Sequence, residues 1–178
     1  KANVRLMKIA IPAAGGATAW AQGRNAMDAK RVGSGLLLQT ADNHELQLPD
    51  VKVVTLKQPT QEDMQDLLFA WKVAKYVKSN AIVLANSKQT VGIGAGQMNR
   101  VGSVKIAIEQ AEAANAIEGA VLASDAFFPM NDSVEYAAKH GIKAIVQPGG
   151  SIKDQDSIEM ANKYGITMLK TSVRHFRH

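Results

Sequence analysis

The chain has 178 residues, a formal net charge of +5 and no cysteine, with 46% hydrophobic and 21% charged residues. This balance is typical of an ordinary globular protein with a packed core, and it excludes a disordered chain or a disulfide scaffold. The lack of cysteine also excludes thiolate nucleophiles and zinc sites with cysteine ligands. The sequence shows no transmembrane run and no signal-peptide order, so we expect a cytoplasmic protein without membrane partners, whose first residue is the edge of a fragment.

The positive charge favours an anionic partner, but its distribution does not favour nucleic acid. Lysine and arginine are scattered and aromatic residues make up only 5% of the chain, which argues against a surface for stacking bases. The exception is Arg174-His175-Phe176-Arg177-His178, where cationic or titratable side chains crowd together. This tail is either part of an anion site or a solvated surface segment.

The N-terminal part is expected to hold short strands joined by irregular connections. Residues 1–10 alternate loosely as a strand, residues 12–25 are a connection rich in alanine and glycine, and strands are expected at residues 32–39 and 51–56. We therefore assign residues 1–58 to a partial strand-and-loop segment and residues 59–178 to the main domain.

The clearest helix signal begins at Thr60. Thr60 is placed as an N-cap, and Asp63 takes the capping-box position three residues later. Apolar residues then recur at three- and four-residue steps, as on one face of a helix, at Met64, Leu67, Leu68, Trp71 and Ala74. The pattern predicts a helix that delivers the chain to Ser79 and Asn80.

A β-hairpin is expected directly after this helix. Residues 81–85 form an apolar run of strand length, residues 86–88 have turn chemistry, and residues 90–93 form a second, β-branched run. Glycines interrupt or follow the second strand, at Gly92, Gly94 and Gly96. Without Cβ atoms they would let backbone N–H groups approach a small anionic or amide-bearing ligand, or they serve a tight turn from strand to helix.

The remaining chain alternates helices and strands. Helices are expected at residues 103–116, 132–140 and 154–164, and strands at residues 120–123, 142–146 and 166–169. Such alternation requires parallel strands with crossover helices on the faces, and the leading hairpin makes one edge antiparallel. The predicted fold class is therefore α/β, with a three-layer α/β/α mixed sheet.

Polar clusters follow the last three predicted strands. Ser124-Asp125 comes after the first, residues 149–151 after the second, and the basic tail at residues 174–178 after the third. Because ligands of open α/β sheets gather at the carboxyl ends of the strands, these clusters should lie along one rim. Each cluster alone is compatible with an ordinary loop, but their placement on one rim favours a site.

Short stretches of the sequence closely resemble one family, the bifunctional purine biosynthesis enzyme that joins AICAR transformylase to IMP cyclohydrolase. They are Lys-Ser-Asn at 78–80, Gly-Ile-Gly-Ala-Gly-Gln-Met-Asn-Arg at 92–100, Ala-Ser-Asp-Ala-Phe-Phe-Pro at 123–129, Gln-Pro-Gly-Gly-Ser at 147–151, and the basic tail. The resemblance covers the chain from about Leu36 to His178, whereas residues 1–35 match more loosely.

The resemblance implies a fold and an activity. The fold would be the second of two cytidine-deaminase-like transformylase repeats, in an enzyme that is a homodimer. The activity would be transfer of a formyl group from the cosubstrate 10-formyltetrahydrofolate to the 5-amino group of AICAR, with no nucleic-acid partner.

The resemblance also implies roles for individual residues. Asn80 would be the catalytic residue near the reacting amine. The nucleotide would be bound by Arg100, Phe127, Arg174 and His178, and the folate by Val101, Pro129, Met130 and Asp132. Ser79 and Asp125 would contribute to a potassium site. These residue types suit the chemistry, because a side-chain amide donates and accepts hydrogen bonds and arginine matches phosphate with paired donors.

A catalytic Lys-His pair of the family, within a Lys-His-x-Asn-Pro pattern, has no counterpart here. Lys139-His140 is followed by Gly-Ile and is predicted as a helix end. We therefore expect the chain alone to be inactive. A zinc nucleoside deaminase of the same fold is excluded because its cysteine ligands are missing. A noncatalytic nucleotide- or RNA-binding module that uses the basic tail remains an alternative.

Overall fold

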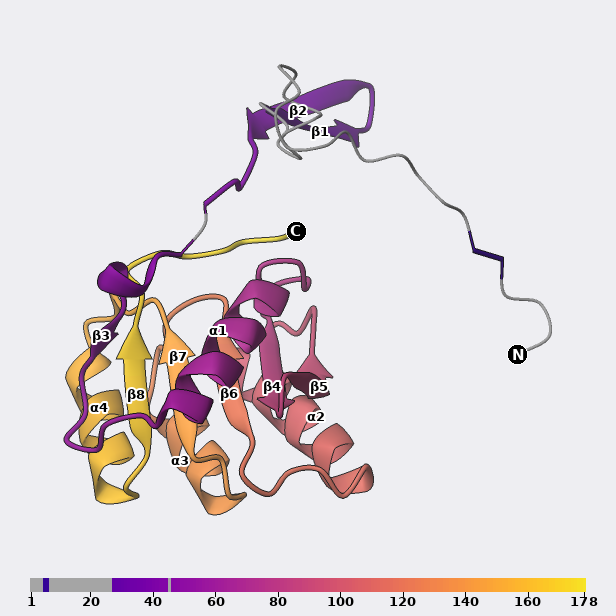
Figure 1. The fold of residues 1–178 in the computed structure, drawn as a ribbon. Helices are drawn as coiled ribbons and strands as arrows, with labels where there is room; N and C mark the ends of the chain where they lie inside the picture. The colour runs from indigo at the N-terminus through magenta and orange to yellow at the C-terminus, as the bar shows by residue number, and fades with distance from the viewer. Residues whose placement is uncertain (1–4, 7–26, 45) are drawn as a thin grey trace, which may run out of the picture. The chain divides into compact units, whose positions relative to one another are not determined.

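The computed structural model describes residues 5–6, 27–44 and 46–178. They belong to two compact units, residues 1–45 and 46–178 (Figure 1). The strand predicted at residues 1–10 and the connection predicted at residues 12–25 lie almost wholly outside the described residues.

The first unit contains a β-hairpin. Strand β1 (Met27–Val32) pairs antiparallel with β2 (Gly35–Thr40), from Met27 opposite Thr40 to Val32 opposite Gly35. The strand predicted at residues 32–39 largely coincides with β2, but its predicted start lies before the turn, at the last residue of β1. Gly33 adopts a positive φ of 55° in that turn, a conformation that glycine reaches without steric cost.

The second unit contains a six-stranded mixed sheet in the order β3-β8-β7-β6-β4-β5. Strands β6, β7 and β8 are parallel, β4 runs antiparallel to both of its neighbours, and β3 is antiparallel to β8. The strands are β3 (Lys52–Val53), β4 (Ile82–Asn86), β5 (Gln89–Gly94), β6 (Val121–Ser124), β7 (Ala144–Gln147) and β8 (Thr167–Lys170). The predicted α/β class, mixed sheet and antiparallel hairpin are confirmed.

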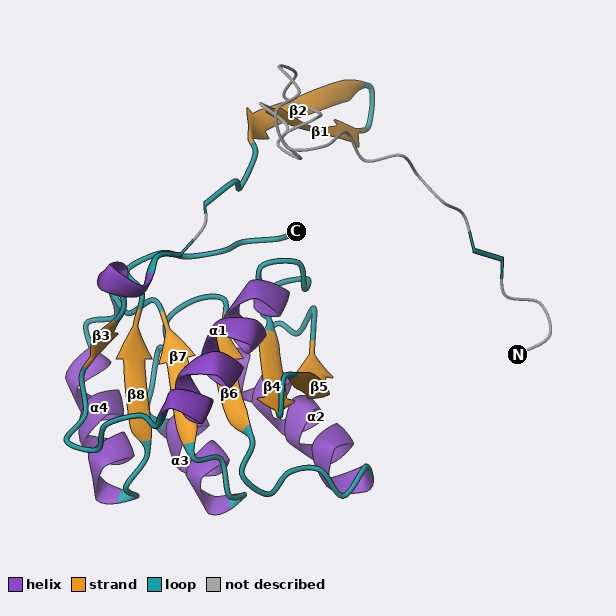
Figure 2. Ribbon diagram, in the orientation of Figure 1, coloured by secondary structure: helices purple, strands orange, loops and turns teal. Residues whose placement is uncertain are grey.

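Helices cover both faces of this sheet and make three layers (Figure 2). Helix α1 (Gln61–Ala74) packs on one face, and α2 (Arg100–Ala113), α3 (Asp132–Lys139) and α4 (Asp154–Lys163) pack on the other. Alternate residues of β4 divide between the two cores: Ile82 and Leu84 join the α2–α4 side, and Val83 joins the α1 side. This alternation follows from the two-residue period of a strand.

The start of α1 and the turn of the hairpin are both stabilised locally. Thr60 Oγ1 accepts a hydrogen bond from Asp63 N at 3.1 Å while Asp63 Oδ2 accepts one from Thr60 N, so the predicted capping box is confirmed. In the β4–β5 turn, Ser87 and Lys88 have φ of 52° and 59°. The buried carboxylate of Asp66 in α1 accepts hydrogen bonds from both of their backbone N–H groups.

Two glycines of β5 allow α2 to approach the strand closely. A Cβ on Gly92 would collide with the carbonyl oxygen of Ala107, and one on Gly94 would collide with that of Ser103. The backbone of α2, rather than a ligand, therefore occupies the space beside Gly92 and Gly94. Gly96 has a φ of 68° and serves the turn from strand to helix, the other role weighed from the sequence.

Residues 46–58 join the same compact unit as residues 59–178, whereas the sequence had placed a boundary at residue 58. Strand β3 pairs with β8, and beyond it the chain stays attached by hydrogen bonds from Val54 N to Met168 O and from Leu56 N to Asn162 Oδ1. The strand predicted at residues 51–56 is therefore shortened to Lys52–Val53. A short 3-10 helix, η1 (Leu48–Asp50), precedes it.

Candidate functional site

The predicted site segments meet at one end of the sheet, where β6, β7 and β8 finish. Strand β4 begins at this end, where Ile82 lies opposite Ser124 and Gly94, the last residues of β6 and β5. Strands β7 and β8 finish at the same end, and the C-terminal tail leaves from it (Figure 1). The predicted rim therefore exists, and Ser79-Asn80 at the start of β4 also belongs to it.

Asp125 is the centre of a buried polar network at this rim. Its side chain is 1% exposed, and Arg100 is 6% exposed. Arg100 Nη1 donates to Asp125 Oδ1 at 2.5 Å, and Ser79 Oγ donates to Asp125 Oδ2 at 2.5 Å. Arg100 Nη1 also lies 3.0 Å from Ser124 Oγ. The carboxylate thus has a charged partner and a hydroxyl partner, as a buried charge requires.

Asn80 is half-buried and held from several directions. Its Oδ1 accepts a hydrogen bond from Arg100 Nη2 at 2.8 Å, and its Nδ2 donates to the carbonyl oxygen of Gln97 at 2.8 Å. Its own carbonyl oxygen accepts from Ser103 Oγ at 2.7 Å. The contacts of Gln97 and Ser103 were missed by the sequence analysis, because no local pattern pairs them with a residue so far along the chain.

Arg100, which the resemblance assigns to nucleotide binding, takes part in this rim network. Both terminal nitrogens of its guanidinium are bonded to protein groups, at Asp125, Ser124 and Asn80. The physical reason is its place as the first residue of α2, which points it inward to the end of β6. Arg100 therefore contacts the predicted catalytic residue from inside the protein.

The C-terminal tail is fastened across the rim by its backbone. Ser79 N donates to Arg177 O at 2.9 Å, Arg177 N donates to Ser79 Oγ at 3.1 Å, and His175 N donates to Asp125 O at 2.9 Å. The imidazole of His175 is 2% exposed, with its ring centre 5.0 Å from that of Trp71 in α1. His175 is thus a core residue inside a predominantly basic segment.

Three of the predicted nucleotide-binding residues lie on or beside this tail. The Arg174 guanidinium lies over the ring of Phe127, 5.5 Å from its centre. His178 stacks on Phe176 at 5.8 Å between ring centres, and both Arg174 and His178 are exposed. Cationic groups and aromatic rings therefore lie together at the rim, which suits an anionic ligand with a planar ring.

The residues predicted to bind folate lie on the segments that follow β5 and β6. Val101 is half-buried in the first turn of α2, while Pro129, Met130 and Asp132 are exposed around the start of α3. Asp132 Oδ1 accepts from the backbone N–H of Ser133. These residues share the rim with Asn80, but they do not join the hydrogen-bond network around it.

Backbone N–H groups of the loop after β7 bind the carboxylate of Asp154. Asp154 accepts hydrogen bonds from Gly150 N at 2.8 Å, Ser151 N at 3.1 Å and Lys170 Nζ at 2.6 Å. Burial raises the pKa of Asp154, but the hydrogen bonds from Lys170 and the two backbone groups outweigh it, so the pKa lies below the usual 3.8. The carboxylate of Asp154, at the start of α4, therefore fixes this loop.

Ser79 and Asp125 do not fit the potassium site that the resemblance implied. A hydroxyl and a carboxylate are oxygen donors of the kind that alkali cations take, yet these two groups are bonded to each other. The guanidinium of Arg100 already neutralises the carboxylate and would repel a second cation. Among residues 5–6, 27–44 and 46–178, no group of three or more histidine, cysteine, aspartate or glutamate side chains could hold a metal ion.

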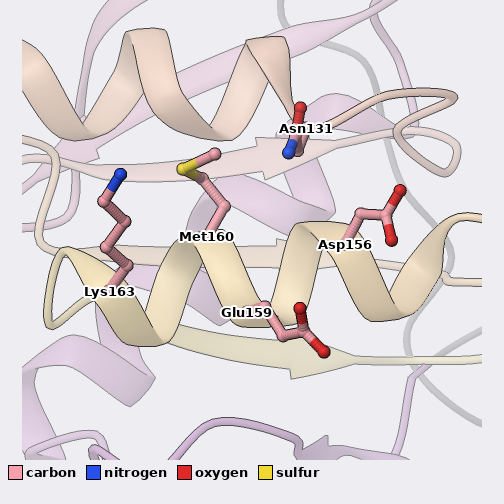
Figure 3. A pocket seen from close by; sticks show the side chains of 5 residues that line it. All are labelled: Asn131, Asp156, Glu159, Met160 and Lys163. Atoms are coloured by element: carbon pink, nitrogen blue, oxygen red, sulfur yellow. The ribbon is translucent and has the colours of Figure 1, made fainter.

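A surface pocket lies away from this rim network. It has a volume of about 260 Å³ and is lined by Asn131, Asp156, Glu159, Met160 and Lys163 (Figure 3). The carboxylates of Asp156 and Glu159 extend from α4 in different directions. None of these residues is among the predicted site residues, and the groups do not converge on one point, so we place the candidate site at the rim.

A family model described as the AICARFT/IMPCHase bienzyme matches residues 1–110 of the chain. The chain belongs to this family. A bifunctional purine biosynthesis protein PurH from Enterococcus faecalis is 58% identical over all of the chain, which covers 33% of that protein. PurH of Staphylococcus epidermidis is 62% identical over 83% of the chain and 30% of that protein. The chain spans about a third of the length of these AICARFT/IMPCHase relatives, which are named for purine biosynthesis.

A solved structure is only distantly similar. A diaminohydroxyphosphoribosylaminopyrimidine deaminase and 5-amino-6-(5-phosphoribosylamino)uracil reductase of Thermotoga maritima aligns with 61% of this chain and 34% of its own, at 18% identity and a TM-score of 0.40. In the part of the chain that the structure describes, no helix is long and apolar enough to cross a membrane.

Proposed function

We propose that this chain forms one side of the site in which an AICARFT/IMPCHase bienzyme transfers a formyl group from 10-formyltetrahydrofolate to the 5-amino group of AICAR. The observation that carries the proposal is the side-chain amide of Asn80, which is held at the rim by Arg100 and Gln97. Ser103 holds the backbone carbonyl of the same residue. A fixed amide of this kind can align a reacting amine, since it both donates and accepts hydrogen bonds.

In the proposed reaction a new C–N bond forms between the amine nitrogen of AICAR and the formyl carbon. The bond from that carbon to N10 of the folate breaks, the amine loses one proton and N10 gains one. The contribution of Asn80 is to hold the amine in line with the carbonyl carbon. The proton-transfer groups are proposed to be the Lys-His pair of the family, contributed by the rest of the bienzyme.

The surrounding residues support the binding of both substrates. Arg174 and His178 supply positive charge for the phosphate of the nucleotide, and the ring of Phe127 offers a face for its planar base. The exposed side chains of Pro129 and Met130 and the half-buried Val101 offer apolar surface for the folate, and Asp132 a polar end to that surface. We further propose that the second unit is a cytidine-deaminase-like repeat and that the cytoplasmic bienzyme is a homodimer.

The test uses a complete bienzyme that carries this chain. Residues 1–178 are exchanged for the matching third of the Enterococcus faecalis relative, with which they share 58% identity. We expect this chimera to transfer formyl groups from 10-formyltetrahydrofolate to AICAR. A stable chimera without transfer, or one that binds arbitrary RNA in a salt-dependent way instead, would contradict the proposal in favour of a nucleic-acid module.

Asn80→Ala in this chimera examines the role of the amide. We expect kcat to fall by about a hundredfold, with a smaller change in KM, because an aligning group acts mainly in the transition state. Asn86→Ala is the matched control, since Asn86 lies at the other end of β4 and its amide also donates to a backbone carbonyl at 2.8 Å. If Asn80→Ala changes only KM, Asn80 is a binding residue.

A further inference from the structure

The structure assigns a positioning role to Asp125 and Arg100, which together orient the amide of Asn80. We infer that Asp125 fixes the guanidinium of Arg100 and that the guanidinium fixes Asn80 Oδ1, so that the amide keeps one orientation while its Nδ2 donates to Gln97 O. This inference rests on the proposed formyl transfer, and it gives Asp125 and Arg100 a positioning role beside the roles that the resemblance implied.

The first support is that the two terminal nitrogens of the Arg100 guanidinium have different partners. Nη1 is bonded to Asp125 at 2.5 Å, and Nη2 is bonded to Asn80 at 2.8 Å. The planar fork of arginine keeps its two terminal nitrogens at a fixed separation, so fixing one nitrogen fixes the other. The orientation of the carboxylate is thereby transmitted to the amide of Asn80.

The second support is that Asp125 holds both residues of the Ser79-Asn80 pair. Its Oδ2 accepts from Ser79 Oγ, and its Oδ1 acts on Asn80 through Arg100. The backbone carbonyl of Asp125 also accepts from His175 N, which fastens the tail that carries Arg174 and His178. One residue therefore sets the relative positions of the amide and the cationic tail.

The third support is the burial of the pair. The side chains of Arg100 and Asp125 are 5% and 1% exposed, so the ion pair is shielded from water. A buried ion pair often contributes little net stability compared with apolar residues of the same volume, and fixing a unique geometry is one reason for retaining it. At this rim the geometry that it fixes is that of Asn80.

Arg100→Lys in the chimeric bienzyme is the discriminating variant. Lysine keeps a positive charge opposite Asp125, so the fold should persist, but its single ammonium cannot reproduce the fork that reaches Asn80 at the same time. We expect kcat to fall about tenfold to a hundredfold while KM for AICAR stays within about twofold. A raised KM for AICAR with unchanged kcat would overturn the inference and return Arg100 to direct nucleotide binding.

Asp125→Asn should act through the same route. Its effect on kcat should be of the same order as that of Arg100→Lys, and the double variant should lose little more than either single variant, because both interrupt one chain of contacts. Multiplied losses in the double variant would show that the two residues act independently. Wild-type kcat in the folded Asp125→Asn protein would also overturn the inference.

Asp63→Asn is the control for loss of a buried carboxylate. Asp63 pairs with Lys143 at 2.8 Å and closes the capping box of α1, so its loss should lower the free energy of unfolding while leaving kcat unchanged. Thermal unfolding of all variants separates stability from turnover. If the unsubstituted chimera transfers no formyl group, the proposed function fails; if it is active and Arg100→Lys has wild-type kcat, only the positioning role fails.

Discussion

Asp125 and Asp66 of the second unit are each 1% exposed, and their carboxylates are satisfied in different ways. Asp125 is paired with a guanidinium, whereas Asp66 accepts two backbone N–H groups of the hairpin turn. Each arrangement offsets the cost of removing a charge from water. Asp125 holds Arg100 in place at the rim, whereas Asp66 holds the turn between β4 and β5 against α1. Two equally buried carboxylates thus stabilise different parts of the structure.

Asp154 provides a pH-dependent test at this scale. Because its pKa in the folded protein is lowered from 3.8, the folded state binds this proton less readily than the unfolded state. Its stabilising contribution is therefore fully present above about pH 4 and is lost as the pH falls through the lowered value. We expect Asp154→Asn to cost about 1 to 3 kcal/mol at neutral pH, and urea unfolding should show that this cost shrinks toward pH 3.

The control for this prediction is Asp156→Asn, in the same first turn of α4. Asp156 is exposed, so the substitution should change the free energy of unfolding by less than about 0.5 kcal/mol. A cost of Asp154→Asn that stays constant between pH 7 and pH 3 would show that the carboxylate charge is not what stabilises the loop.

At the scale of elements, the β4–β5 hairpin carries strain in its turn. Ser87 and Lys88 both adopt positive φ, which costs an ordinary residue about 1 to 2 kcal/mol. Lys88→Gly removes this strain and keeps the N–H that donates to Asp66, so we expect the free energy of unfolding to rise by about 0.5 to 1 kcal/mol. Chemical denaturation measures the change.

The matched control is Lys105→Gly, an exposed lysine inside α2. In a helix the same substitution should destabilise the protein by about 1 kcal/mol. Equal destabilisation by both substitutions would mean that the turn does not hold Lys88 in the left-handed conformation.

The contact of α2 with β5 gives a second test at this scale. Gly94→Ala places a methyl group against the carbonyl of Ser103, and backbone atoms on both sides leave little room to move. We expect a loss of about 3 kcal/mol or more in thermal unfolding. Gly35→Ala in β2 should be tolerated, since its added Cβ would meet only the Val32 carbonyl at 3.6 Å. Similar stabilities of the two variants would contradict the close packing.

Elements with local signals could be predicted from the sequence, and contacts between distant residues could not. The capping residues of α1 and the turn of the hairpin lie within a few positions of each other, and both were predicted correctly. The bonds of Asp125 to Ser79 and Arg100 span 46 and 25 positions. A list of rim residues could be drawn up from strand ends, but which of them are bonded together depends on the folded sheet.

At the scale of the whole molecule, this chain holds one side of the proposed site. The Lys-His pair that the family resemblance assigns to proton transfer does not occur in it, and loss of an acid–base group typically costs about a hundredfold to ten-thousandfold in rate. We expect the purified 178-residue chain to show no measurable formyl transfer. Adding the separately expressed remainder of the bienzyme should restore some activity, as a coupled assay would measure.

Robust transfer by the chain alone would contradict this expectation, provided that its Asn80→Ala variant is inactive and so excludes contaminating host enzyme. Sedimentation of the chimeric bienzyme at micromolar concentration examines the proposed homodimer at the same time. A clean monomer with full activity would show that the proposed site does not depend on a second copy.

The two edges of the six-stranded sheet differ from those of an aggregation-prone protein. At one edge, β3 offers only Lys52–Val53 to an incoming strand. At the other, the N–H of Ile93 in β5 already donates to Gln110 Oε1 of α2 at 3.0 Å, so a side chain occupies the place of a neighbouring strand. Both features reduce the backbone available to a further β-strand, which disfavours edge-to-edge association of the folded domain.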